Sequence, residues 1–408
     1  MIERKSLIRQ KIAIALGPIQ AFFRYEASSG ILLLFFAVLA MILANSPWAE
    51  SYESVLALKL PFAPAEYHLD LSVLHLVNDG LMAIFFFVIG LEIKREFFFG
   101  ELQSLSATIL PICAALGGML IPAFIYVIVN AGGAPEAMAG WGIPMATDIA
   151  FSLGILAIVA QGVPIAIVIF LTALAIVDDL GAIIVIALFY TSGFSAAALF
   201  GGLASLGCAF FVNRKGVKNF IAYLIFGLIA WLFFLNAGIH PTIAGVVLAF
   251  AIPIDRHHPE RSVLYKIEHA LEPWSAYVIM PIFALANAGV RLPGDISALL
   301  DPIALGIVLG LCIGKPLGIC CMVFLFSRVL RLSLPTSFGR WNVLGSGCLA
   351  GIGFTMSLFI ASLAFPNPEH LATAKLGIIA ASLLSGTLGA LVFLLAKGRS
   401  STNETNMQ

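Results

Sequence analysis

Two adjacent carboxylic acids, Asp178 and Asp179, stand in the middle of a long apolar stretch, TALAIVDDLGAIIVIALFY. Two carboxylates this close repel each other when both are ionised, so the pair should bind and release protons as a coupled unit. Carboxylate oxygens are also ligands that suit small, hard cations. One site could therefore hold either protons or a metal cation, and competition between them is sufficient chemistry for ion exchange.

Three other ionisable residues lie within apolar stretches: Asp148 and Lys315 well inside, and Asp79 near one end. A charge at mid-bilayer costs roughly 2.5–3.5 kcal/mol, so such residues normally face a protein interior or a watery cavity and mark ion or proton pathways. The structural alternative is a buried salt bridge of Lys315 with Asp178 or Asp179. It would account for a lone acid better than for an adjacent pair with a third aspartate.

The composition of the 408-residue chain indicates that its solvent is lipid. Hydrophobic residues make up 61% and charged residues 11%, and the formal net charge is zero. That leaves too little polar surface for a water-soluble globule and no electrostatic footprint for a nucleic acid. The six cysteines lie in apolar runs without a CxxC motif, so we interpret them as buried apolar residues, and we expect no cofactor.

The chain is predicted to be one all-α, polytopic membrane domain, residues 1–408. Apolar runs of about 20 residues recur along it, and continuous runs of this length form helices rather than barrel strands. We expect twelve spans, at 29–45, 76–93, 107–129, 138–159, 164–190, 196–212, 219–234, 238–254, 264–288, 302–326, 342–364 and 372–396. With the N-terminus inside, 18 of the 22 Lys and Arg residues fall in inside segments, so both termini should be cytoplasmic.

Two of these spans should be broken. In the fourth, Pro144 precedes Asp148 in GIPMATDIAFSLG, and proline removes a backbone donor. In the eleventh, four glycines weaken the middle of SGCLAGIGFTMSLFIASLAF. A break leaves unpaired backbone groups and half-helix dipoles at mid-membrane. There Asp148 can neutralise positive helix ends, Thr147 can supply an oxygen, and Lys315 can balance negative ends.

The positions of the two broken spans predict an internal symmetry. The fourth and eleventh spans occupy equivalent places in the triplets 3–5 and 10–12. Interrupted spans at corresponding positions of two halves are the sequence sign of inverted repeats around a site at the bilayer midplane. We therefore expect these two spans to cross there.

Two further features have open interpretations. Charged residues gather near the inner ends of the second and ninth spans; they are Glu92, Lys94, Arg95, Glu96, Arg261, Lys266, Glu268, His269 and Glu272. They form either a solvated, salt-bridged surface or a cation funnel with a pH-sensing network. In the outside loop 46–75, alternating apolar residues on both sides of residues 63–66 indicate either a small hairpin that packs on a second subunit or an irregular loop.

The strings ATDIAFSLG, ALAIVDDLGAIIVIALFY, LCIGKPLG and GIGFTMSLFIASLAF resemble the NhaA family of bacterial Na+/H+ antiporters, and the resemblance runs from the first span to the twelfth. It implies a twelve-helix fold whose fourth and eleventh helices are unwound and cross. It also implies electrogenic exchange of one Na+ or Li+ for two protons at the bacterial inner membrane, for Na+ and pH homeostasis. Such a protein is a transporter and not an enzyme.

The resemblance also implies roles for individual residues. Asp178 and Asp179 match the aspartates that bind the cation and the protons, and Thr147 and Asp148 match the unwound fourth helix. Lys315 matches a lysine near the site, either a proton carrier or a structural partner. Positions linked to the cytoplasmic funnel, the pH response or the dimer region are matched by Asp79, Glu92, Glu96, Glu268, His269 and His240. From the residue alone, His240 is more often packed than a ligand.

The 46–75 loop also resembles the family, whereas one motif in the ninth span differs from some members. The 46–75 hairpin matches the one through which a homodimer forms. Some members carry His-Pro-Trp where this chain has Glu272-Pro273-Trp274. Histidine titrates near neutrality and an exposed glutamate does not, so the profile of activation with pH should differ.

Three other functions use similar residues. A Na+-coupled symporter of an organic anion needs a roomier site with polar side chains for the solute, which the spans do not offer. An intramembrane aspartyl protease needs aspartates on different helices and a GxGD string, which is absent. A passive channel would pass ions without proton coupling.

Overall fold

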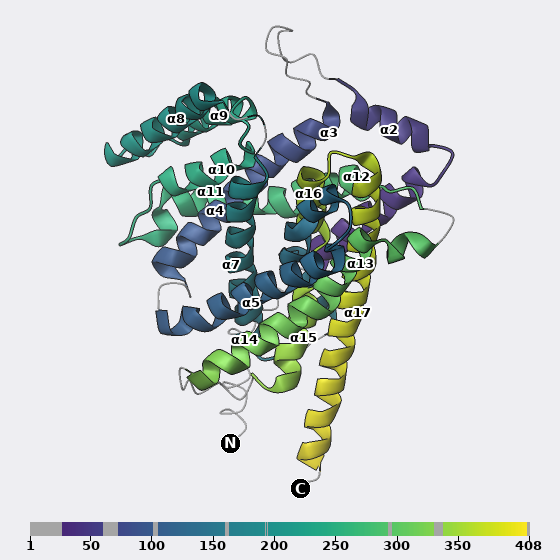
Figure 1. Cartoon of the computed structure of the whole chain (residues 1–408). Coiled ribbons are helices and arrows are strands. Elements are labelled where there is room, and N and C mark those ends of the chain that lie inside the picture. Colours follow the sequence, from purple (N-terminus) through teal and green to yellow (C-terminus); the bar gives the residue numbers. More distant parts are fainter. Residues whose placement is uncertain are drawn as a thin grey trace, which may run out of the picture.

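The computed structural model describes residues 27–59, 72–100, 105–159, 163–191, 193, 195–292, 296–329 and 338–405. Within these ranges the regular structure is helical, apart from one isolated antiparallel bridge between Lys59 and Ser72 (Figure 1). By length and composition, seven of the helices described here can cross a membrane, or up to nine if each of two bent pairs is one span. The chain is therefore a multi-pass membrane protein.

The seven long spans include composite helices. Five of them are Ala27–Ala44, Thr108–Asn130 within α5 (Leu105–Asn130), α7 (Ile165–Phe189), α8 (Ala196–Arg214) and Pro368–Ala396 within α17 (Pro368–Thr405). The span Val73–Phe99 consists of α3 (Val73–His75), a π-helical turn (Leu76–Leu81) and α4 (Met82–Phe99). The span Pro302–Val329 consists of α13 (Pro302–Leu309), a π-helical turn (Gly310–Gly314) and α14 (Lys315–Val329).

Two spans are bent at a break, as the sequence predicts. A 3-10 helix, Pro135–Met145, meets α6 (Ile149–Val159) at 46°, and α15 (Arg340–Ala350) meets α16 (Phe354–Ala364) at 43°. The remaining helices are α2 (Ala49–Ala57), α9 (Phe220–Leu235), α10 (Thr242–Ala251), α11 (Val263–Trp274), a π-helical turn (Ser275–Ile279) and α12 (Met280–Asn287), with short 3-10 turns at Pro259–Arg261 and Ile296–Leu300.

Each of the twelve ranges expected from the sequence is helical over most of its length. The seventh and eighth ranges contain the short helices α9 and α10, and the ninth contains α11 and α12 joined by the π-helical turn. Helices α9 and α10 are apolar but too short for an unbroken span, and the ninth range is not a candidate span either, so up to nine spans are supported and twelve stays a prediction.

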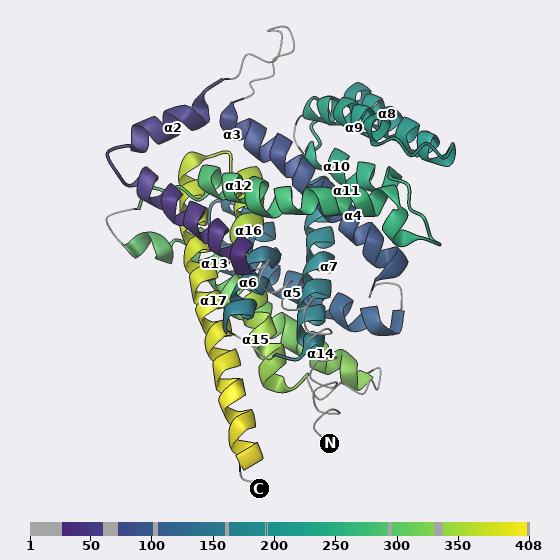
Figure 2. The same cartoon turned by 180° about the vertical axis from the view of Figure 1, so that it is seen from behind.

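The buried apolar residues form two clusters. The larger includes side chains of α4, α5, α7 and both bent pairs, and the smaller joins α8, α9, α10 and α11. Helix α4 contributes to both, with Phe86 and Ile89 in the larger cluster and Phe87 and Leu91 in the smaller. Figures 1 and 2 show α8 and α9 side by side at one corner of the molecule.

The loop predicted to hold a hairpin begins with a helix. In α2, the Tyr52 hydroxyl donates a hydrogen bond of 2.6 Å to the carbonyl of Leu285, and Glu53 forms an ion pair of 2.9 Å with Arg291. Burial raises the pKa of Tyr52 to about 12, so the hydroxyl keeps its proton at physiological pH. Of the predicted strands, only the start at Leu58 and Lys59 is described, and Lys59 forms the isolated bridge with Ser72; residues 60–71 lie outside the described residues.

Helices α5 and α14 approach each other through two glycines. A Cβ atom on Gly117 would meet the carbonyl oxygen of Gly318, and a Cβ atom on Gly318 would meet the carbonyl oxygen of Gly117. The two backbones are therefore in direct contact, as small residues allow between helices in lipid.

Replacing Gly117 with Ala should lower the free energy of unfolding by roughly 1–3 kcal/mol, because the added methyl group meets backbone that cannot move aside. Thermal unfolding in detergent measures the effect. The matched control is Gly207→Ala in α8, where no atom lies within 4 Å of the new Cβ. That change should be neutral or stabilising by up to about 1 kcal/mol. Equal shifts in both variants would contradict a tight contact between α5 and α14.

Candidate ion-binding site

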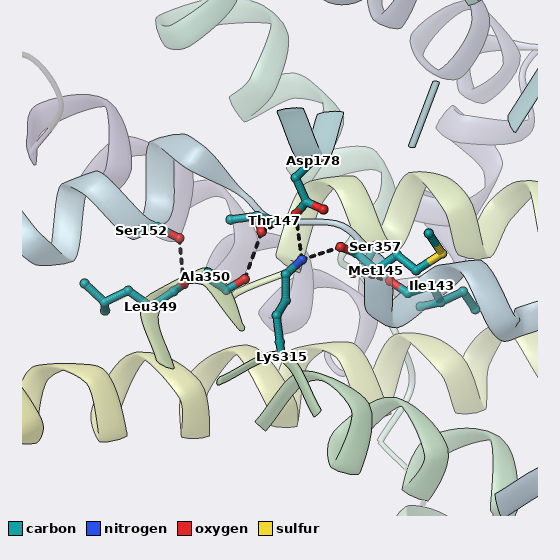
Figure 3. Close-up of polar contacts among 9 residues, drawn as sticks. All are labelled: Ile143, Met145, Thr147, Ser152, Asp178, Lys315, Leu349, Ala350 and Ser357. Carbon is teal, nitrogen blue, oxygen red and sulfur yellow. Dashed lines mark hydrogen bonds and ion pairs between the residues drawn. The ribbon is translucent and has the colours of Figure 1, made fainter. Parts of the chain in front are cut away.

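The breaks in the two bent spans lie against each other. The backbone N–H of Asp148 donates to the carbonyl of Ile352 at 2.7 Å. The Thr147 hydroxyl donates to the carbonyl of Ala350 at 3.0 Å, and the Ser152 hydroxyl donates to the carbonyl of Leu349 at 2.8 Å (Figure 3). Backbone groups that lost their helical partners at one break are thus satisfied by the other, as a buried break requires.

Asp148 joins the starts of the two half-helices that follow the breaks. Its Oδ1 accepts the backbone N–H of Phe151 at 3.0 Å, in the first turn of α6. Its Oδ2 accepts the backbone N–H of Thr355 at 3.1 Å and the Thr355 hydroxyl at 2.5 Å, in the first turn of α16. A carboxylate at two helix N-termini is where the helix dipoles favour negative charge. This is the geometry expected if Asp148 compensates the dipoles.

Asp178, on α7, is held by two donors. Its Oδ2 accepts the Lys315 ammonium at 2.7 Å and lies 2.5 Å from the Thr147 hydroxyl, whose one proton is shared between this oxygen and the carbonyl of Ala350. Lys315 begins α14, is fully buried, and also donates to the carbonyl of Met145 at the first break. In Figure 3 the ammonium points between the Asp178 carboxylate and that carbonyl. The lysine thus pairs with Asp178, which is the ion pair considered as the structural alternative.

Asp179 faces elsewhere, as expected for helix neighbours about 100° apart. It is 2% exposed, and its Oδ1 has no hydrogen-bond partner among the described residues. It lines a cavity of about 250 Å³ together with Thr147, Asp148 and Glu92. A buried carboxylate oxygen without a donor is costly unless it binds a proton or a cation. The cavity therefore meets the pair at Asp179, while Asp178 lies behind it.

The charged residues of α4 and α11 only partly converge. Arg95 donates to Glu268 at 2.7 Å and to Glu96 at 2.6 Å, and Glu92, Arg95, Glu96 and Glu272 line the same cavity as Asp179. Lys94 points away and donates to the carbonyls of Phe250 and Ile252 at the end of α10.

The remaining predicted residues do not line this cavity. His269 stacks on Tyr265, with ring centroids 4.2 Å apart. His240 Nε2 lies 3.3 Å from Asp79 Oδ1, and the His240 ring meets the edge of Phe359 on α16. The pair of Asp79 and His240 therefore joins the second span to the segment before α10 and to α16.

Thr355, which follows the glycines of the eleventh span, was given no role from the sequence. In the structure its hydroxyl and its backbone N–H both donate to Asp148. The signal was available, because a hydroxyl residue stands beside the break in each bent span, Thr147 in one and Thr355 in the other. Ser357 was also missed, and its hydroxyl donates to the carbonyl of Ile143 at 2.8 Å.

Replacing Thr355 with Val should lower the free energy of unfolding by about 1–3 kcal/mol, because a buried carboxylate loses a donor without a change in side-chain shape. The matched control is Thr387→Val on α17, where the exposed hydroxyl bonds only to carbonyls of its own helix. Thermal unfolding of both variants in the same detergent gives the comparison. A Thr355 variant as stable as the control would show that this bond contributes nothing.

Comparison with known proteins identifies the family. The family described as "Na+/H+ antiporter 1" matches residues 20–393. The chain is 48% identical over 399 residues to a protein named Na(+)/H(+) antiporter NhaA 1 of Clostridium beijerinckii, covering 96% of this chain and 98% of that protein. It is 49% identical over 381 residues to Na(+)/H(+) antiporter NhaA 2 of Pseudomonas syringae pv. syringae (93% and 95% covered). It is 48% identical over 374 residues to Na(+)/H(+) antiporter NhaA of Vibrio campbellii (91% and 93% covered). With bent spans that meet at Asp148 and a family match over nearly its whole length, the chain belongs to the Na+/H+ antiporter 1 family.

Proposed function

We propose that this chain exchanges Na+ or Li+ for protons across the membrane by alternating access, the activity named for its relatives. The observation that carries the proposal is Asp179, a buried carboxylate with an oxygen that has no partner among the described residues, at the wall of a cavity. Its neighbour Asp178 is held by Lys315 and Thr147. Asp178 Oδ1 also has no partner among the described residues, but Asp178 does not line the cavity, so Asp179 is the carboxylate that an ion in the cavity meets.

The oxygen atoms around the cavity suit a small hard cation. Asp179, Thr147, Asp148 and Thr355 all line it, and carboxylate and hydroxyl oxygens are the ligands such cations prefer. No group of three or more His, Cys, Asp or Glu side chains that could hold a resident metal ion occurs in the described part of the chain. The family is named for the exchange of Na+ and H+, so the proposal takes the cation as a transported substrate and not as a cofactor.

Exchange follows if the loaded states exclude each other. Na+ or Li+ binds when the pair Asp178/Asp179 has lost its protons, and protons displace the cation on the other side. Lys315 either carries the second proton or supports Asp178, since an ammonium within 2.7 Å of that carboxylate can do both. With two protons entering for each cation that leaves, the membrane potential drives the cycle at about 2.3 kcal/mol per charge per 100 mV.

The proposal includes the finer architecture expected from the sequence. It comprises twelve spans, inverted repeats of helices 3–5 and 10–12, and crossing of the fourth and eleventh spans at the bilayer midplane. The protein lies in the bacterial inner membrane with both termini cytoplasmic, and two copies pair through the 46–75 hairpin. The hydrogen bonds between the two breaks support the crossing.

A role in a cytoplasmic funnel or in the response to pH is proposed for Glu92 and Glu96, which line the cavity, and for Glu268, which Arg95 holds together with Glu96. His269, His240 and Asp79 belong to this proposal only through the resemblance, since they do not line the cavity.

The decisive experiment compares wild type, Asp179→Asn and Asp301→Asn in inside-out vesicles. Addition of Na+ or Li+ should collapse a preformed ΔpH with wild type and leave it unchanged with Asp179→Asn, because the amide cannot bind a proton and a cation in turn. Asp301→Asn is the matched control. Asp301 caps α13 through Ile303, and asparagine caps equally well, so exchange should persist.

Loss of exchange in both variants would point to a folding defect. If no cation changes ΔpH between pH 6 and 9 in folded wild type, the antiporter proposal fails and symport of an organic anion becomes the next test. The names of the relatives give no support to symport.

Competition between ions predicts a specific dependence on pH. Lowering the pH on the side from which Na+ binds should raise the apparent KM for Na+, by up to roughly tenfold per pH unit for each proton displaced. The maximal rate at saturating Na+ should change much less over the same range. Initial rates measured in proteoliposomes over a series of Na+ concentrations test this. A KM that does not change with pH would contradict a shared site for the two ions.

A further inference from the structure

We propose that an acyl chain of a membrane phospholipid binds in an apolar cavity where the helix Ala27–Ala44 passes α17. The cavity has a volume of about 560 Å³ and is larger than the one beside Asp179. Its walls include Leu34, Val38, Met41, Ile379 and Leu383. Binding here can be measured without transport, so it stands or falls separately from the proposed exchange.

The position of the cavity identifies its occupant. The helix Ala27–Ala44 is a candidate membrane span, and three of its wall residues are strongly exposed: Leu34 at 41%, Val38 at 49% and Ile42 at 58%. In a membrane these side chains meet hydrocarbon and not water. The cavity is therefore open to the acyl chains of the bilayer.

The length of the cavity matches one leaflet. Its wall follows the helix from Leu34 to the helix end at Ala44, roughly 15 Å at a rise of 1.5 Å per residue. Half of the hydrocarbon core of a bilayer is about 15 Å. An extended acyl chain can therefore lie along the groove with its glycerol end near Ser46 and its methyl end near mid-membrane.

Polar groups lie where a phospholipid would place its own. Asn45 and Ser46 line the cavity at the end of the helix, and Asn45 is fixed by bonds to the carbonyl of Val290 and the N–H of Leu292. The lining along the membrane depth is apolar except for Ser382, whose buried hydroxyl has no hydrogen-bond partner among the described residues. Polar groups at one end of the cavity and an apolar lining along the rest fit a lipid whose glycerol end lies near Asn45 and Ser46 and whose acyl chain lies along the groove.

The cavity borders the two breaks. Phe151 and Phe354 line it, and their ring centroids are 5.7 Å apart. The backbone N–H of Phe151 donates to Asp148, and Phe354 immediately precedes Thr355, the other donor to Asp148. A bound acyl chain therefore supports, from the lipid side, the two rings that flank the hydrogen bonds of Asp148.

The test uses delipidated protein in detergent, titrated with palmitoyl-oleoyl phosphatidylethanolamine and examined by native mass spectrometry. The wild type should retain one lipid per chain in a saturable manner. Val38→Trp, which fills the groove from a half-exposed position, should lower the apparent affinity at least tenfold. The matched control is Ile31→Trp, an exposed residue of the same helix that does not line the cavity; it should bind like wild type.

Equal retention by all three proteins, or none by wild type, would overturn the proposal. If Val38→Trp does not fold, Leu383→Trp fills the same groove from α17. Ser382→Ala distinguishes the ligand class, since an acyl chain needs no hydroxyl. A tenfold loss in that variant would assign the cavity to a molecule with a polar atom at mid-depth instead. Dissociation of dimers by Val38→Trp without loss of lipid would assign it to a second copy of the chain.

Discussion

The arrangement of the site depends on the hydrogen bonds that the Asp148 carboxylate accepts from two half-helices. Two membrane helices are interrupted in the protein interior, and each interruption exposes backbone donors that hydrocarbon cannot satisfy. One carboxylate accepts N–H groups from the first turn of both following half-helices, and the Asp148 N–H returns a bond to the opposite break. Without a negative group at this point, two helix N-termini would face each other with like partial charges.

The hydrogen bonds at the two breaks also explain why Asp178 and Asp179 have different surroundings. Thr147 precedes Asp148 at the same break, and its hydroxyl reaches Asp178. Lys315 touches the carbonyl of Met145, just before the break, and the same Asp178 oxygen. Asp178 is thereby tied to the break, whereas Asp179, one residue on, turns toward the cavity. Two chemically identical side chains acquire different surroundings because a helix separates neighbours by about 100°.

Much of this was accessible from the sequence. Proline and glycine marked both breaks, and aspartates within apolar stretches marked the site. What the sequence could not supply was the rotation of α7, which decides that Lys315 meets Asp178 and not Asp179 and which is set by packing against other helices. The rotation of α4 was likewise not available from the sequence. It directs Lys94 to the end of α10 and Arg95 to Glu268. Thr355 was missed because its partner, Asp148, lies 207 residues away in the chain.

The glycine contact between α5 and α14 has a consequence for motion. These helices belong to different triplets, the third and tenth expected spans, and their backbones touch where no methyl group fits. The two triplets are also joined at the breaks, so they should turn as one body during a transport cycle. Any sliding of one group of helices past another then has to occur at a different interface. The division of the apolar interior into two clusters points to the boundary between those clusters. Helix α4 contributes to both clusters, and its backbone touches α10 where Gly245 meets the carbonyl of Ala83, so α4 belongs with α8, α9 and α10 to the part against which that body turns.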